Sequence, residues 1–173
     1  MGPITIHNRY SRKVMRNLCT QILFATALSS MFAQTINAQS DEQIVAETLL
    51  GEARGEGRVG LYAVACVIQE RINDKRWPST GRKVCLQPKQ FSCWNGRAIK
   101  CSLAGNKKIK HREYALSLAR VIVAKKKLKD ITDKANHYHA VGVHPRWTRG
   151  IKPFGSARIK PVVVLGRHIF YRL

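Results

Sequence analysis

The stretch ETLLGEARGEGRVGLYAVACVIQERI, residues 47–72, decides the fold of this chain and carries most of its functional signal. Apolar residues recur at helical spacing before residues 55–57, and a second apolar stripe follows them at i, i+3, i+4 and i+7. A glycine inside a helix costs about 1 kcal/mol relative to alanine, and residues 55–57 contain two glycines. We therefore expect two helices, residues 41–54 and 59–73, joined by a tight turn.

Two carboxylates, Glu52 and Glu56, lie on either side of this break. Glu52 is expected in the last turn of the first helix, beside a buried second helix. A carboxyl group held partly away from water keeps its proton more readily, which is what a general acid requires. The plainer interpretation is that both carboxylates are solvated or pair with Arg54 and Arg58, and spacing alone does not decide between the two.

The first 38 residues have the pattern of a secretory signal peptide. A basic segment precedes an apolar run, residues 18–32, and a small-residue exit follows at Ala38. The apolar run is too short and too rich in Ser, Thr and Gln for a good membrane span, although an uncleaved amphipathic anchor is the alternative. We expect residues 1–38 to be a signal peptide, residues 39–173 to be one domain, and the protein to be exported to the periplasm or cell envelope.

The exported part is strongly basic. Four of the 31 Lys and Arg residues and none of the ten Asp and Glu residues precede residue 39, so residues 39–173 carry a formal charge of +17. Such a charge implies polyanionic partners or surroundings, such as anionic envelope polymers or nucleic acid. No nucleic-acid-binding motif is present, so we expect no specific nucleic acid.

In an exported protein, three cysteines of the aperiodic segment 83–106 are disulfide candidates: Cys85, Cys93 and Cys101. A Cys93–Cys101 bridge would staple a surface loop, and Cys85–Cys101 is the competing pair. Cys66 lies on the apolar face of the second helix and is expected to be a buried thiol. No CxxC pair supports a zinc site.

The C-terminal half predicts one further helix, residues 110–128, and a short hairpin, residues 162–171, whose residues are β-branched and aromatic. His137, His139 and His144, together with His168, are candidate zinc ligands. Because no HExxH helix and no clear carboxylate ligand accompany them, we expect neither a metal nor a cofactor.

At this point the motifs resemble those of the SleB/CwlJ-type cell wall hydrolases, a family that includes spore cortex-lytic enzymes. The segments that carry the resemblance cover essentially all of residues 41–171. They are Gly51–Glu56, Gly60, Ala63–Arg71, Pro78, Leu86–Pro88, Gln90–Ser92, Ala135–Tyr138, Pro145–Trp147 and Gly166–Tyr171. Two departures are Gln69-Glu70 before Arg71, where one Asn is usual, and the imidazole-rich His137-Tyr138-His139.

The resemblance implies an α+β, lysozyme-like domain of the lytic transglycosylase type, mainly helical with a small β element. It implies cleavage of the β-1,4 bond between N-acetylmuramic acid and N-acetylglucosamine in peptidoglycan. The catalytic acid of the family corresponds to Glu52. One carboxyl group acts twice in such enzymes: it protonates the leaving oxygen and then deprotonates the muramic C6 hydroxyl as it closes onto C1, giving a 1,6-anhydro product.

The resemblance also suggests roles for further residues. Glu56 is expected to be a structural partner of Arg54, Arg58 or a backbone N–H. The residues expected to contact substrate are Tyr138, Gln90, Phe91, Ser92, Trp147 and His168. The expected partners are peptidoglycan glycan strands and, through the positive charge, anionic envelope polymers; we expect a monomer.

Three other functions compete with lytic transglycosylation. A secreted basic protein that binds envelope polymers or nucleic acid without catalysis would show strongly salt-dependent binding that Glu52→Gln leaves intact. A peptidoglycan amidase with zinc would be sensitive to chelators. A simple hydrolase would release reducing muramic acid.

Overall fold

The structure, a computed structural model, describes residues 39–95, 102–103, 108–149 and 159–173. The expected signal peptide, residues 1–38, and Cys101 lie outside the described residues. Residues Ser40–Leu173 form one compact unit. In the part of the chain that is described, no helix has both the length and the apolar character needed to cross a membrane.

Helix α2, Asp41–Ala53, confirms the first expected helix to within one residue. It begins with the expected capping box, in which the Gln43 backbone N–H donates to Ser40 Oγ and the Ser40 N–H donates to Gln43 Oε1. The apolar residues before the break are fully buried in the core. Glu52 lies in the last turn of this helix, as expected.

The break between the first two helices is a 3-10 turn, Arg54–Glu56, followed directly by α3, Gly57–Asn73. Gly57 has φ 66°, a left-handed conformation that glycine adopts without the steric penalty of a side chain. This glycine lets α3 begin two residues earlier than expected. The second helix is confirmed and ends at the expected residue.

The third helix is shorter than the pattern predicted. Helix α5 spans Arg112–Val123, and Lys125 then adopts φ 55°. The Gln69 side chain of α3 donates to the Lys126 carbonyl and accepts from the Leu128 N–H, at 2.7 and 2.8 Å. The Lys126 carbonyl and the Leu128 N–H are therefore bonded to Gln69 instead of to other backbone groups of a longer helix. For this reason α5 ends before the predicted residue. A short helix that was not expected, α4, spans Gly81–Cys85 and is capped by Thr80.

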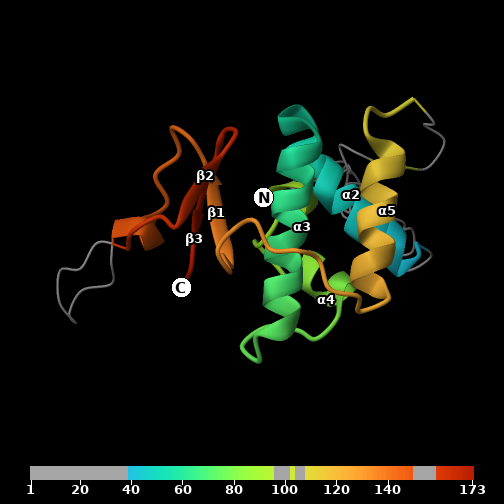
Figure 1. Cartoon of the computed structure of the whole chain (residues 1–173), viewed down its shortest axis with the longest axis horizontal. Coiled ribbons are helices and arrows are strands. Elements are labelled where there is room, and N and C mark those ends of the chain that lie inside the picture. The colour runs from blue at the N-terminus through green and yellow to red at the C-terminus, as the bar shows by residue number, and fades with distance from the viewer. Residues whose placement is uncertain (1–38, 96–101, 104–107, 150–158) are drawn as a thin grey trace, which may run out of the picture. The chain divides into compact units, whose positions relative to one another are not determined.

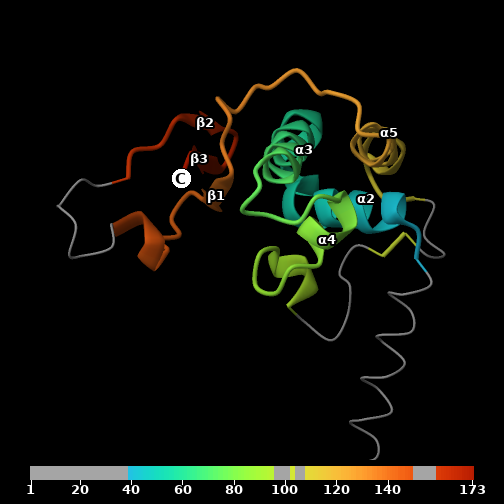
Figure 2. The same cartoon turned by 90° about the horizontal axis from the view of Figure 1, so that it is seen from below.

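A three-stranded antiparallel sheet has the order β1-β3-β2. The expected hairpin is confirmed as β2, Val163–Leu165, and β3, His168–Tyr171. Strand β1, His137–Ala140, was expected only as an aromatic segment, and it pairs with β3 in the register Tyr138–Phe170. In Figures 1 and 2, the sheet lies on one side of α3, while α2 and α5 lie on the other.

One face of the sheet packs on α3. Ala63 and Val67 of α3 form a buried cluster with Ala135 and Phe170, and Tyr138 packs against this cluster. Tyr138 and Phe170 are directly paired across the strands, so they share the face that meets the helices. This packing turns Tyr138 toward the helical part of the unit, where Glu52 lies.

Candidate active site

Three hydrogen-bond donors converge on the half-buried carboxylate of Glu52. The Ser92 hydroxyl and the Cys93 backbone N–H both donate to Oε1 at 3.0 Å. The Tyr138 hydroxyl donates to Oε2, also at 3.0 Å. The carboxylate therefore joins α2, the 3-10 helix Ser92–Trp94 and strand β1, which are far apart in the sequence.

One face of α2 holds the 3-10 helix in place. Thr48, Gly51 and Glu52 lie at i, i+3 and i+4, so they share this face. Thr48 Oγ1 accepts from the Trp94 indole N–H at 2.9 Å. A Cβ atom on Gly51 would lie 2.5 Å from Cys93 Cβ, which is closer than carbon atoms pack. The absence of a side chain at Gly51 thus lets the Cys93 N–H reach Glu52.

Replacing Gly51 with alanine is expected to push the 3-10 helix away from α2. The overpacking costs about 1–3 kcal/mol of unfolding free energy and lengthens two hydrogen bonds to Glu52. Urea denaturation and an assay of glycan cleavage measure the two effects. Gly55→Ala is the matched control, because a Cβ there meets nothing within 4 Å and Gly55 is not among the positive-φ residues. Equal stability and activity of the two variants would contradict this account.

Tyr138 remains a hydrogen-bond donor over the whole physiological pH range. Burial, the neighbouring charge of Glu52 and the hydrogen bond to that carboxylate raise the pKa of Tyr138 well above its ordinary value. The ring is fixed by His168 and Phe170, whose centroids lie 5.1 and 5.6 Å from it. His168 is itself buried, and burial lowers the pKa of its imidazole, so a neutral ring packs beside Tyr138.

Glu56 contacts the β2–β3 turn. Its Oε2 accepts from the Arg167 backbone N–H at 2.8 Å. Two glycines make room for it, because a Cβ on Gly60 or Gly166 would lie 2.2 or 2.5 Å from its side-chain atoms. This backbone contact is one of the structural partners expected for Glu56, and it locks the hairpin onto the start of α3.

Phe91, Gln90 and Trp147 are further residues that were predicted to contact substrate. Phe91 is only 1% exposed and belongs to the core, directly before the 3-10 helix Ser92–Trp94. Gln90 is half-buried beside it. Trp147 is also half-buried, and its ring lies 5.3 Å from His137 and 5.1 Å from Tyr171, on β1 and β3. For Phe91, Gln90, Trp147 and His168, contact with substrate stays a prediction.

The disulfide candidates have different outcomes. Cys85 is a free thiol with no exposed surface, so the structure corrects its assignment as a disulfide partner. The core around α4 encloses this sulfur, and burial raises the pKa of Cys85 to about 12. Cys66 is a buried thiol, as expected. The Cys93–Cys101 pair involves a residue outside those described and stays a prediction.

The free energy of unfolding is expected to decrease as the pH is lowered from about 6.5 to 4. Burial, with the nearby charges of Arg71 and Arg76, lowers the pKa of His137 from 6.5 to about 4. The unfolded chain therefore binds a proton in this window that the folded chain does not, which favours unfolding by up to about 3 kcal/mol. Urea denaturation from pH 7 to 4 measures the loss. His137→Phe keeps a ring between Trp77 and Trp147 and should flatten the profile; an unchanged profile would contradict the assignment.

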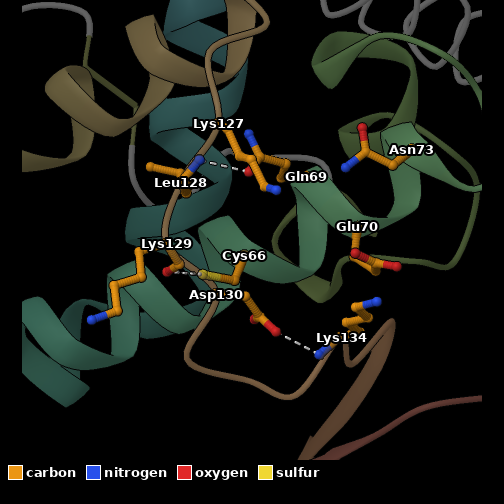
Figure 3. Close-up of a pocket in the computed structure, with 9 residues that line it drawn as sticks. All are labelled: Cys66, Gln69, Glu70, Asn73, Lys127, Leu128, Lys129, Asp130 and Lys134. Atoms are coloured by element: carbon orange, nitrogen blue, oxygen red, sulfur yellow. Dashed lines mark hydrogen bonds between the residues drawn. The ribbon is translucent and has the colours of Figure 1, made fainter.

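A hollow away from the proposed site shares no lining residue with the Glu52 cluster. It has a volume of about 710 Å³ and lies between α3 and the segment that leaves α5 (Figure 3). Its lining residues are Cys66, Gln69, Glu70, Asn73, Lys127, Leu128, Lys129, Asp130 and Lys134. No group of three His, Cys, Asp or Glu side chains in the described ranges is placed to hold a metal ion. The expectation that no metal or cofactor is needed stays a prediction.

Comparison with known proteins decides the family. The family model described as Cell Wall Hydrolase matches residues 55–171, about two thirds of the sequence. The chain belongs to the cell wall hydrolase family. This confirms the resemblance drawn from the motifs and assigns the chain to a family of enzymes. The matched range begins three residues after Glu52, so the assignment of Glu52 as the catalytic residue rests on its motif and geometry.

Curated relatives of this cell wall hydrolase include two spore cortex-lytic enzymes. The protein from Oceanobacillus iheyensis is 42% identical over 55 residues, which is 32% of this chain and 20% of that protein. The protein from Bacillus cereus is 38% identical over 55 residues, or 32% of this chain and 21% of the relative. The chain thus spans about a fifth of the length of these relatives.

Two solved structures share the fold. The catalytic domain of the Bacillus cereus SleB protein has a TM-score of 0.55 and 24% identity, covering 76% of this chain and 89% of that one. The catalytic domain of the germination-specific lytic transglycosylase SleB from Bacillus anthracis has a TM-score of 0.57 and 25% identity. That match covers 79% of this chain and 98% of the other. The expected α+β class, with a helical body and a small sheet, is confirmed.

Proposed function

We propose that this cell wall hydrolase is a lytic transglycosylase. It cleaves the β-1,4 bond between N-acetylmuramic acid and N-acetylglucosamine in peptidoglycan, with Glu52 as its single acid and base. The observation that carries the proposal is the convergence of three donors on the Glu52 carboxylate. One structural relative, the SleB protein from Bacillus anthracis, is itself named a lytic transglycosylase.

The hydrogen bonds indicate which oxygen of Glu52 moves the proton. Each carboxylate oxygen offers about two acceptor sites. Ser92 and Cys93 use both sites of Oε1, whereas Tyr138 uses one site of Oε2. The open site on Oε2 carries the proton to the leaving glycosidic oxygen. The same oxygen then accepts the proton of the muramic C6 hydroxyl as that hydroxyl attacks C1.

The other carboxylates in the C-terminal half have local roles. Asp130 caps its own turn by accepting from the Thr132 and Lys134 N–H groups, and Glu113 and Asp133 pair with Arg112 and Arg172. A two-carboxylate glycosidase needs a second acid residue across the scissile bond. An internal hydroxyl removes that need, because a well-placed intramolecular nucleophile has a very high effective molarity. This favours transglycosylation over hydrolysis.

Digestion of purified sacculi in ¹⁸O-labelled water, followed by mass spectrometry of the products, tests this proposal. Anhydro-muramic ends without ¹⁸O are expected, because the C6 hydroxyl and not water attacks C1. Reducing ends that carry ¹⁸O would show that water attacks C1 and that the enzyme is a hydrolase. Intact glycan with its peptide stems in place would contradict cleavage and favour a basic binding protein. Intact glycan from which whole peptide stems have been released would indicate an amidase.

The proposal includes the setting of the reaction. Export through the signal peptide, residues 1–38, would bring the domain to the periplasm or cell envelope, where its substrate lies. The formal charge of +17 on residues 39–173 favours retention on anionic envelope polymers. Retention on sacculi should therefore weaken as salt rises and be the same for Glu52→Gln as for the wild type. A binding protein without catalysis would show the same retention, so the loss of cleavage in Glu52→Gln is what separates the two functions.

A further inference from the structure

Arg71 is a buried cation without a direct ion pair. It lies in the last turn of α3 and is only 3% exposed. None of the ion pairs found among the described residues includes it. Charged side chains are rarely buried unless they are paired, because removing a charge from water costs several kcal/mol. The burial of the Arg71 charge therefore requires a structural or functional explanation.

The Arg71 guanidinium group contacts three separate segments, which contain Asn136, Trp77 and Phe91. Its Nε–H donates to the Asn136 carbonyl at 2.7 Å. Its Cζ lies 4.3 Å from the centroid of the Trp77 ring and 5.2 Å from that of Phe91. Its Nη1 is enclosed and has no hydrogen-bond partner. The group is thus held in the core by stacking and by one strong hydrogen bond.

Two of these three segments, those of Phe91 and Asn136, carry the donors to Glu52. Phe91 directly precedes Ser92 and Cys93, the donors to Oε1, and Asn136 lies two residues before Tyr138, the donor to Oε2. We infer that Arg71 is a positioning residue for the proposed reaction. Its guanidinium group fixes both segments around Glu52, and its charge stabilises the carboxylate that forms when Glu52 gives up its proton. This inference rests on the proposed function.

The charges around the site support the electrostatic part of the inference. Burial lowers the pKa of Arg71 from 12.5 to about 10, and Tyr138, Cys85 and Glu52 oppose this shift. Arg71 therefore stays charged at neutral pH. Because Tyr138 and Cys85 have raised pKa values, both are uncharged there, and Glu52 is the group among the three that can carry a negative charge. His168 of β3, the remaining ionisable ring beside Glu52, is kept neutral by burial.

Two substitutions separate the geometric role from the electrostatic one. Arg71→Met keeps a long apolar side chain and removes the charge. Arg71→Lys keeps the charge but lacks the planar fork that stacks between rings and bonds the Asn136 carbonyl. Arg120→Met is the control, because the Arg120 side chain on α5 is 59% exposed and forms an ion pair with Glu42.

Kinetics on soluble, uncrosslinked glycan strands give the main readout. For Arg71→Met we expect kcat to fall about 10²-fold with little change in KM, since displaced catalytic groups cost about this much. The alkaline limb of its pH profile should move to higher pH. Arg71→Lys should lose part of kcat and keep the wild-type profile, and Arg120→Met should match the wild type. A folded Arg71→Met with wild-type kcat and pH profile would overturn the inference.

Nuclear magnetic resonance of the Cys93 amide tests the inference without activity. This amide donates to Glu52, so its resonance reports the protonation of that carboxylate. In Arg71→Met it should exchange faster with solvent and titrate at a higher pH; an unchanged amide would contradict a positioning role even if the wild type cleaves no glycan. If Arg71→Met does not fold, Arg71→Lys decides, because wild-type kcat and exchange in that variant would overturn the role of the fork.

Discussion

Replacing Glu52 with glutamine is expected to lower the rate of glycan cleavage by roughly 10²- to 10⁴-fold, the usual contribution of a general acid and base. The amide has the shape of the carboxyl group but cannot deliver a proton. Its carbonyl oxygen can accept from Ser92 and Cys93, and its NH₂ can face the Tyr138 hydroxyl, which then acts as acceptor. The fold around the site should therefore survive.

Initial rates on soluble glycan strands measure this effect, with urea denaturation as the check on folding. The unfolding free energy of Glu52→Gln should stay close to that of the wild type, while binding to sacculi persists. Substantial cleavage by a folded Glu52→Gln variant would exclude Glu52 as the acid.

Tyr138→Phe is expected to lower kcat by roughly 10- to 100-fold and to leave KM nearly unchanged. The substitution keeps the ring that packs against His168 and Phe170 and removes only the hydroxyl that donates to Glu52. A hydrogen bond to a charged group contributes about 1.5–3 kcal/mol, and each 1.36 kcal/mol on a barrier is a factor of ten in rate. Steady-state kinetics on the same strands measure both constants.

Tyr62→Phe is the matched control for this experiment. The Tyr62 hydroxyl also makes one hydrogen bond across the fold, to the Lys129 carbonyl at 3.0 Å, so its partner is not Glu52. It should lose a little stability and no activity. If both tyrosine variants lost activity equally, the hydroxyl of Tyr138 would have no special role.

Local patterns were sufficient to predict the helices that carry Glu52. The capping box at Ser40, the glycine break and the two apolar stripes are short-range signals, and each is confirmed within two residues. The motif resemblance named Ser92 and Tyr138, which contact Glu52 in the structure. It also named Phe91, whose burial shows that a motif residue can support a site from within the core.

Other parts of the site depend on tertiary contacts that leave no local pattern. The Cys93 donor is a backbone N–H, which every residue but proline carries, and its position depends on the fit of the 3-10 helix against Gly51. The C-terminal end of α5 depends on Gln69, which bonds backbone groups 57 and 59 residues further along the chain. Arg71 ends the motif segment Ala63–Arg71, and nothing in the sequence indicates that its side chain is buried.

The most direct test of the central claim compares three proteins on the same sacculi: the wild type, Glu52→Gln and Glu56→Gln. The measurement is the number of new glycan ends per enzyme molecule. We predict many ends from the wild type and almost none from Glu52→Gln. Every Glu56→Gln molecule that folds should still cleave glycan, because the role of Glu56 is to hold the hairpin through the Arg167 N–H. Full cleavage by Glu52→Gln together with a folded but inactive Glu56→Gln would contradict the account and move the acid to Glu56.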